Sequence, residues 1–435
     1  MRFVRSLGAA VVVAPALLVA GTAAPAYAVE GDCRDIAVQD SAQYSTDAES
    51  LPLSEMEVTR AWARLAKEGK RPGAGVVVAV IDSGIAAQAP IDVVAHVSAG
   101  NKQPVPEDYH GTAVAGLIAG KPRGDDPATT GVGIAPYARI YDVQVYDNPT
   151  AADSPDSQES PITVANVVQG LDAVIQAAPG LGIRIVNMSL AVPDDPAIRE
   201  RVARLWEMGV VVVAPTGNRP STELPVPDLP PSFAEGHQPG EDAAPYIHPA
   251  DYPSVLAVNA SMTGLDPSVD PTSVVMENSM TKVAAPTAGA VSYSVRGESC
   301  VLTDPATSYA AAEVSGVLAL LQSAYDEPIA ASVQRLLTTA NGREDVPNTL
   351  LGAGEVQALE ALTRPLVLDP STGANLGEGT VKHEPQVLSV PRQPDDVLAS
   401  TRRNAVWWGL VGGGTLLLAL VLRPVLARRR RSLSR

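Results

Sequence analysis

Apolar and polar positions along the middle of the chain predict buried strands that alternate with amphipathic helices. Residues 76–81 form an uninterrupted apolar run rich in valine, which is typical of a strand covered on both faces. Further strands are expected at residues 140–145, 183–188, 210–214 and 255–258, and helices at residues 163–178, 196–208 and 333–339. This order predicts an α/β fold, a mostly parallel sheet with helices on both faces, whose ligands bind at the carboxyl ends of the strands.

A further helix is expected before the first strand. Ser54 and Glu57 have the spacing of a capping box, and apolar residues follow at helical spacing. Gly69 then supplies a stop signal. The pattern therefore predicts a helix that begins near Ser54 and ends before Gly69.

The most uniformly apolar helix expected in the body follows Ser308. Residues 309–321 are small or apolar on nearly every side, which indicates a helix buried in a large core. Ser308 would lie at its N-terminus, where unpaired N–H groups and the helix dipole favour a negatively charged oxygen. A plain capping role is the alternative for a single serine in this setting.

The two ends of the chain predict export and membrane anchoring. Residues 1–28 contain two arginines, an apolar run and a small-residue cleavage site, as a signal peptide does; a short membrane anchor fits less well. Residues 405–422 are uncharged and apolar and would span about 27 Å as a helix. A tryptophan pair near their start, Trp407 and Trp408, and a basic tail at 423–435 predict one transmembrane helix, a cytoplasmic C-terminus and an extracytoplasmic body at the cell membrane.

Three parts are expected between these ends. Residues 29–53 are polar and predict an extension that lies over the surface, whereas residues 54–363 hold the periodic elements of one domain. Residues 364–404 have no clear period and predict a Pro-rich tether. Two long polar segments, 147–161 and 219–249, interrupt the domain as surface loops.

Charge and cysteine content narrow the class of protein. Without the signal peptide and the residues from Arg402 onward, 22 basic and 48 acidic residues remain, a net charge of −26. So acidic a body excludes nucleic acid as the expected partner. Cys33 and Cys300 are the two cysteines of the chain. In an oxidising exterior they can pair, and two buried free thiols are the alternative.

Three distant patterns together suggest catalysis. Asp82 follows the first buried strand, His110 leads into a helix of small residues, and Ser308 leads into another. The order Asp, His, Ser is one of the orders in which a serine-protease triad occurs. A base activates the serine and a buried carboxylate orients that base. Asn218, at the end of a strand, could direct its amide at an oxyanion, or could simply occupy a turn.

These segments resemble the subtilisin-like serine proteases. The resemblance rests on residues 78–84, 110–116, 186–190, 217–218 and 307–311, in this order, and covers about residues 60–362. It implies a triad of Asp82, His110 and Ser308, with Asn218 as the oxyanion donor. It also places Ser189 and Leu190 beside the strand that binds substrate.

With its extension, acidic body, tether and single span, the chain is more narrowly similar to the mycosins. These are membrane-anchored subtilases of the type VII secretion systems of actinobacteria. The resemblance implies a peptide or protein substrate and a type VII secretion membrane complex as partner. The expected function is that of an extracytoplasmic serine endopeptidase, and the alternative is a structural subunit that braces the complex. No cofactor is expected, and no loop has convincing calcium-ligand spacing.

Two positions depart from the subtilase pattern. Ala306 stands where glycine is usual, and its Cβ could crowd the substrate pocket or strain the backbone. Ala312 stands where proline is usual, which removes a constraint from the first turns of the serine helix. Neither change removes a reacting atom. The two changes would therefore affect the reaction rate and the substrate preference.

Overall fold

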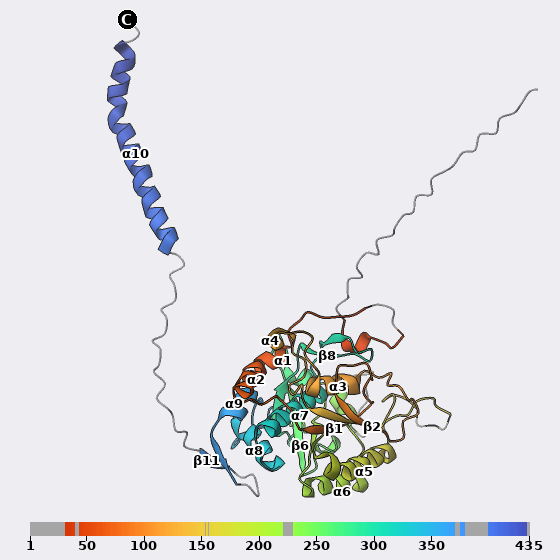
Figure 1. The fold of residues 1–435 in the computed structure, drawn as a ribbon. Coiled ribbons are helices and arrows are strands. Elements are labelled where there is room, and N and C mark those ends of the chain that lie inside the picture. The colour runs from red at the N-terminus through yellow and green to blue at the C-terminus, as the bar shows by residue number, and fades with distance from the viewer. Residues whose placement is uncertain are drawn as a thin grey trace, which may run out of the picture. The chain divides into compact units, whose positions relative to one another are not determined.

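A seven-stranded parallel sheet forms the centre of the body (Figure 1). The computed structural model describes residues 31–39, 43–152, 154, 156–220, 229–369, 375–378 and 399–432. The order of the strands in the sheet is β2-β3-β1-β4-β5-β6-β7. The seven strands are β1 (Val77–Asp82), β2 (Val93–Ser98), β3 (Arg139–Gln144), β4 (Ile183–Asn187), β5 (Val211–Pro215), β6 (Val255–Ser261) and β7 (Val283–Pro286).

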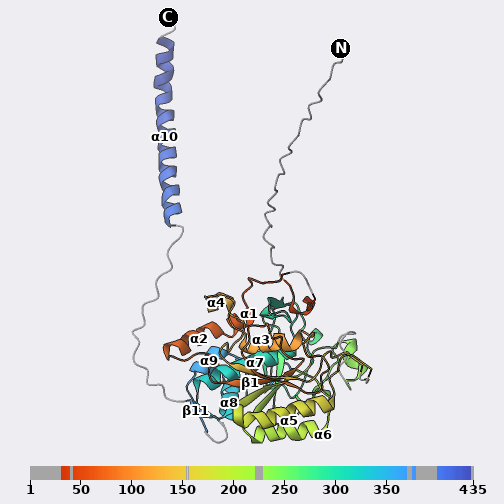
Figure 2. The same cartoon turned by 45° about the vertical axis from the view of Figure 1, so that its right-hand side comes forward.

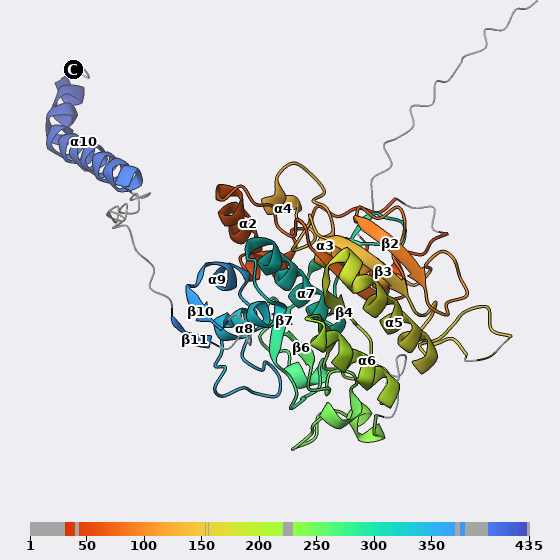
Figure 3. The same cartoon turned by 60° about the horizontal axis from the view of Figure 1, so that its bottom comes forward.

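Helices cover both faces of this sheet, as the sequence predicts. Figure 2 shows α3 (His110–Ala119) and α7 (Thr307–Ala324) on one side of β1, and α5 (Val164–Leu181) and α6 (Pro196–Glu207) on the other. The two helices of the second layer lie side by side (Figure 3). Alternate residues of β1 enter the two cores: Val78 and Val80 pack in the core that contains α7, and Ala79 and Ile81 in the core that contains α5. Because side chains of a strand alternate between faces, a strand buried on both sides must be apolar throughout.

The remaining elements surround the sheet. Two small antiparallel pairs are β8 (Ala290–Tyr293) with β9 (Ser299–Leu302), and β10 (Leu366–Leu368) with β11 (Asn375–Glu378). Further helices are α1 (Leu51–Glu55), α2 (Val58–Lys67), α4 (Pro127–Thr130), α8 (Ile329–Thr339) and α9 (Ala358–Thr363). Short 3-10 turns are η1 (Cys33–Asp35), η2 (Pro231–Glu235), η3 (Ala244–Tyr246) and η4 (Pro271–Ser273).

The expected capping box before the first strand is wrong. Ser54 lies inside α1, and Glu57 lies between α1 and α2 with a left-handed φ of 54°. Glu57 makes no capping hydrogen bond and instead pairs with Arg60 on the exposed side of α2. The two helices are thus separated at the residue that the pattern placed within one continuous helix.

The N-terminal extension does more than lie over the surface. Cys33 and Ile36 are buried in the main core, and Cys33 is bonded to Cys300 on β9. Asp32 also forms a parallel bridge with Val301 of the same strand. The predicted disulfide is therefore confirmed, and the extension is partly an inner element of the domain.

The C-terminal part of the chain is a separate unit. It comprises residues 381–435, and its described residues form one helix, α10 (Ala399–Ser432). Residues Asn404–Arg423 are long and apolar enough to cross a membrane. The start of the expected tether is not featureless, because β10 and β11 lie within it. The proposed signal peptide, residues 1–28, lies outside the described residues.

Candidate active site

The sheet topology brings the predicted site residues to one edge. Asp82 ends β1 and His110 begins α3, while Asn218 follows β5 and Ser308 lies in the first turn of α7. His110, Asn218 and Ser308 line one cleft of about 350 Å³. Carboxyl ends of parallel strands share an edge, which is why residues so distant in sequence meet there.

Asp82 and His110 form a closely coupled pair. The His110 Nδ1 lies 2.9 Å from Oδ1 and 3.0 Å from Oδ2 of Asp82. The Asp82 side chain is 1% exposed and that of His110 is 17% exposed, so the carboxylate is buried and the imidazole reaches the cleft. An Asp carboxylate on Nδ1 leaves Nε2 as the nitrogen available for proton transfer.

Gly111 packs closely against Gly84, and this close approach lets α3 place His110 beside Asp82. A Cβ placed on Gly111 would lie only 2.5 Å from the carbonyl oxygen of Gly84. The Gly111 N–H donates to the Ser83 hydroxyl at 2.9 Å, which ties the start of α3 to the turn after β1. A larger residue at 111 would force the helix away from the carboxylate.

Burial and nearby negative charge shift the pKa of His110 in opposite directions. Burial lowers the pKa of His110, but the charge of Asp82, its hydrogen bond and the charge of Asp108 together raise that pKa above its ordinary value. Asp108 also accepts the His110 backbone N–H at 2.8 Å. The pKa of Asp108 is itself raised, mainly by burial.

Ser308 is held from behind by β4. The Ser189 hydroxyl donates to the Ser308 carbonyl oxygen at 2.8 Å, and Asn187 Nδ2 donates to Ser189 Oγ at 2.9 Å. Ser189 and Leu190 line the cleft, and the Ser189 hydroxyl also supports the Ser308 backbone. No local pattern in the sequence indicates this second contact.

Ala306 does not strain the backbone ahead of Ser308. Its φ of −145° and ψ of 143° lie in the extended region, which any residue adopts. Ala312 is fully buried in the core around α7, so the helix continues through a position where proline is usual. The expectation of backbone strain at 306 is therefore wrong.

Two tyrosines that the sequence analysis missed flank the imidazole. The Tyr109 and Tyr309 rings lie 6.2 Å and 6.0 Å from the His110 ring, measured between centroids. Their hydroxyl oxygens are 3.0 Å apart, which links the start of α3 to the start of α7. Their positions next to His110 and Ser308 in the sequence were the available signal.

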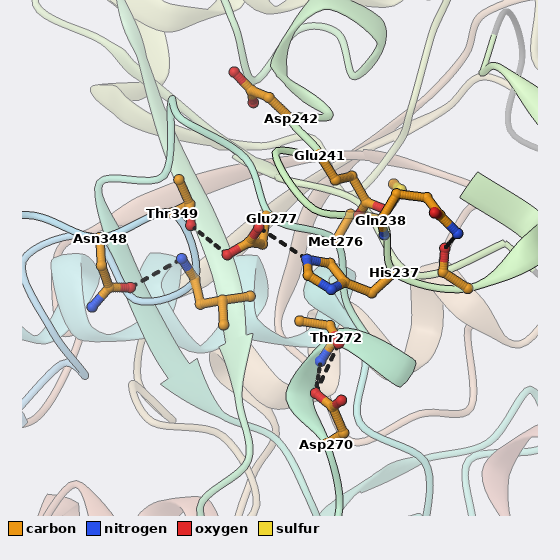
Figure 4. Close-up of polar contacts among 12 residues, drawn as sticks. His237, Gln238, Glu241, Asp242, Asp270, Thr272, Met276, Glu277, Asn348 and Thr349 are labelled. Carbon is orange, nitrogen blue, oxygen red and sulfur yellow. Dashed lines mark hydrogen bonds and ion pairs between the residues drawn. The ribbon is translucent and has the colours of Figure 1, made fainter. Parts of the chain in front are cut away.

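The long segment after Asn218 is anchored by a buried ion pair. Arg219 donates to both carboxyl oxygens of Glu241 at 2.8 Å and 2.7 Å. Beyond it, His237 contacts Glu277 at 3.1 Å, and the other Glu277 oxygen accepts the Thr349 hydroxyl at 3.0 Å (Figure 4). These contacts give the predicted loop 219–249 a fixed base beside the cleft.

Metal ligands do not cluster in the part of the chain that the structure describes. No group of three or more His, Cys, Asp or Glu side chains there could hold a metal ion.

Comparison with known proteins identifies the family of the chain. Residues 73–354 match the peptidase S8 family, described as the subtilase family. Mycosin-3 of Mycobacterium tuberculosis (strain ATCC 25618 / H37Rv) is 30% identical over 404 residues, which cover 82% of this chain and 81% of that protein.

Solved structures share the fold. The MycP3 protease from the type VII (ESX-3) secretion system has a TM-score of 0.52 and 27% identity, covering 73% of this chain and 89% of that chain. A chain of an intact ESX-5 inner membrane complex has a TM-score of 0.55 and 23% identity, covering 90% and 94% respectively. The predicted subtilisin-like fold and the similarity to mycosins are confirmed, and the chain belongs to the subtilase family of serine endopeptidases.

Proposed function

We propose that this chain hydrolyses peptide bonds with Asp82, His110 and Ser308 as its triad. The observation that carries the proposal is the His110 imidazole, which is held by both Asp82 oxygens and faces the cleft that Ser308 also lines. In this reaction the Ser308 Oγ attacks the peptide carbonyl while the His110 Nε2 takes its proton. The imidazolium then gives that proton to the leaving amine, and water hydrolyses the acyl-enzyme.

Asn218 supports the same reaction as an oxyanion donor. Asn218 lines the cleft, and its Nδ2 is an N–H donor. The first turn of α7 adds backbone N–H groups near Ser308. Donors fixed in advance stabilise the developing negative charge without rearranging during the reaction. Ser189 and Leu190 are proposed to contact the substrate chain along the cleft.

An active-site fluorophosphonate tests the triad directly. The full-length protein should be labelled on Ser308, and Ser308→Ala and His110→Ala should both abolish labelling. Ser279→Ala, which removes an exposed hydroxyl away from the cleft, is the matched control and should label normally. Labelling of the folded Ser308→Ala variant, or none of the wild type, would reject the proposed triad.

The enzyme is proposed to act outside the cytoplasm, anchored by α10. The apolar stretch Asn404–Arg423 is followed by four consecutive arginines, Arg428 to Arg431, and basic residues favour the cytoplasmic side. Protease treatment of intact cells should digest the body and spare a C-terminal tag. The mass of the mature protein tests cleavage after Ala28 and whether the extension is retained.

A second candidate function is structural support of a type VII secretion membrane complex. Its supporting observation is the fold shared with a chain of the ESX-5 inner membrane complex over 90% of this chain. If this role dominates, Ser308→Ala should leave secretion intact while deletion of the chain abolishes it. Association with such a complex would appear as co-purification of the tagged full-length protein with membrane components of the secretion system.

A further inference from the structure

Tyr146, two residues after the end of β3, contacts the Asp82 carboxylate. Its hydroxyl donates to Asp82 Oδ1 at 3.1 Å, and the residue is 2% exposed. The register of the sheet explains this contact: Asp82 pairs with Gln144 across β1 and β3, and the Val145 N–H donates to the Asp82 carbonyl oxygen at 2.9 Å. Tyr146 is therefore the next residue that can reach the carboxylate from the neighbouring strand.

The hydrogen bonds at Asp82 are unevenly shared between its oxygens. Oδ1 accepts from the Ser83 N–H at 2.8 Å and from Tyr146, and also lies 2.9 Å from the His110 Nδ1. Oδ2 lies 3.0 Å from the same His110 nitrogen. Two donors besides the imidazole thus hold Oδ1 and fix the rotation of the carboxylate, so that both of its oxygens face the His110 Nδ1.

Tyr146 remains a donor throughout the working pH range. Burial, and after it the negative charge of Asp82, keep the pKa of Tyr146 well above its ordinary value. Its aromatic ring meanwhile lines the cleft with His110 and Ser308. The residue therefore links the wall of the substrate cleft to the carboxylate behind the imidazole.

We propose that Tyr146 is a positioning residue of the triad, which holds Asp82 so that both carboxylate oxygens face His110 and which limits the basicity of that imidazole. A donor that shares the charge of a carboxylate weakens its attraction for a neighbouring cation. Without the hydroxyl, Asp82 would stabilise the imidazolium more strongly and would be freer to rotate. This inference rests on the proposed function, because it assigns a role within the same triad.

Other charged groups around the pair must be held constant in any test. Asp108 lies two residues before His110 and Asp142 lies on β3, and both carboxyls interact with Asp82 through charge. Asp142 is itself paired with His96 at 2.7 Å. None of these groups changes in a Tyr146→Phe variant, which retains the ring and removes one oxygen.

Tyr252→Phe is a matched control. The Tyr252 hydroxyl donates to Asp194 Oδ1, also at 3.1 Å, and Tyr252 is 1% exposed, but it lies outside the cleft lining. Both variants lose a buried tyrosine hydroxyl bonded to a carboxylate. Only Tyr146→Phe is expected to alter the triad.

The test is a titration of His110 by NMR in the full-length protein, with labelled histidine and His110→Gln for assignment among the five histidines. Tyr146→Phe should raise the pKa of His110 by roughly 0.5 to 1 pH unit, and Tyr252→Phe should not move it. With a peptide substrate, Tyr146→Phe should lower kcat about 3- to 10-fold and leave KM within about twofold.

Each outcome decides the inference. An unmoved His110 titration would overturn it, and a raised KM with an intact kcat would make Tyr146 a substrate contact instead. The titration requires no turnover, so it remains decisive if the wild-type protein cleaves no peptide. A shifted titration without fluorophosphonate labelling would reject the proposed protease function while retaining the role of Tyr146 at Asp82.

Discussion

Asn218 and Thr307 are joined by two hydrogen bonds across the cleft. The Asn218 Oδ1 accepts the Thr307 backbone N–H at 2.8 Å and the Thr307 hydroxyl at 3.0 Å. Because a backbone N–H can only donate, this contact determines which amide atom faces Thr307. The Asn218 Nδ2 is thereby turned away from Thr307, as the proposed role of Asn218 as oxyanion donor requires.

Asn218→Ala should therefore impair turnover far more than binding. We expect kcat to fall by about 10²- to 10³-fold, the magnitude known for the oxyanion donor of a related subtilisin, with little change in KM. Thr307→Val removes only the hydroxyl contact and should cost less than about tenfold. Equal losses in the two variants would contradict the oxyanion role of Asn218.

Asp108→Asn should move the pH dependence of the enzyme to lower pH. The negative charge of Asp108 contributes to the raised pKa of His110, and asparagine keeps an oxygen for the His110 N–H. Removing the charge lowers the pKa of His110, so the base is neutral at a lower pH. The measurement is the acidic limb of kcat/KM against pH. A limb that stays in place or moves to higher pH would exclude this electrostatic contribution.

Glu313 should make the folded protein less stable as pH rises. The residue is 1% exposed within α7, and its Oε2 has no hydrogen-bond partner in the described part of the chain. Burial holds the pKa of Glu313 well above its ordinary value. Its carboxyl is therefore neutral when folded, while the unfolded chain ionises near the ordinary value. The associated stability is fully present below that value and is lost as pH rises toward the folded pKa.

Glu313→Gln should accordingly flatten this pH dependence. The free energy of unfolding, measured by denaturant titration between about pH 5 and pH 8, should fall less steeply in the variant than in the wild type. Glu200→Gln, on the exposed side of α6, is the control and should leave the slope unchanged. Parallel curves for wild type and Glu313→Gln would show that Glu313 is not the group responsible.

Loss of the Cys33–Cys300 bond should lower stability without removing the site. The bond closes a sequence separation of 267 residues and joins the N-terminal extension to β9, shortly before Ser308. The double variant Cys33→Ser, Cys300→Ser should lose about 2–4 kcal/mol in its free energy of unfolding. Fluorophosphonate labelling at low temperature should persist, since neither cysteine lines the cleft. Loss of labelling in the folded double variant would show that the extension shapes the active site.

Local patterns predicted five of the seven strands of the sheet, β1, β3, β4, β5 and β6, and the helices α5 and α6, with bounds within three residues of those observed; β2 and β7 were not predicted. The apolar run before Asp82 and the periodic helix after Thr163 appear as β1 and α5, because burial on both faces or on one face leaves a clear period in the sequence. Short edge elements were missed: β2 is largely exposed and β10 lies in the expected tether, so neither has a strong apolar pattern. At Glu57, a left-handed residue divided what the pattern treated as one helix.

By itself, the sequence determined which groups could react: one carboxylate, one imidazole, one hydroxyl and one amide, each in a recognisable local setting. Only the tertiary structure decided how they are supported. Tyr146 reaches Asp82 because β3 lies beside β1, and Ser189 reaches the Ser308 carbonyl because β4 lies behind α7. Such contacts join residues far apart in the chain, so the local periodicity of the sequence does not indicate them. Strand order and register are set by the packing of the whole core.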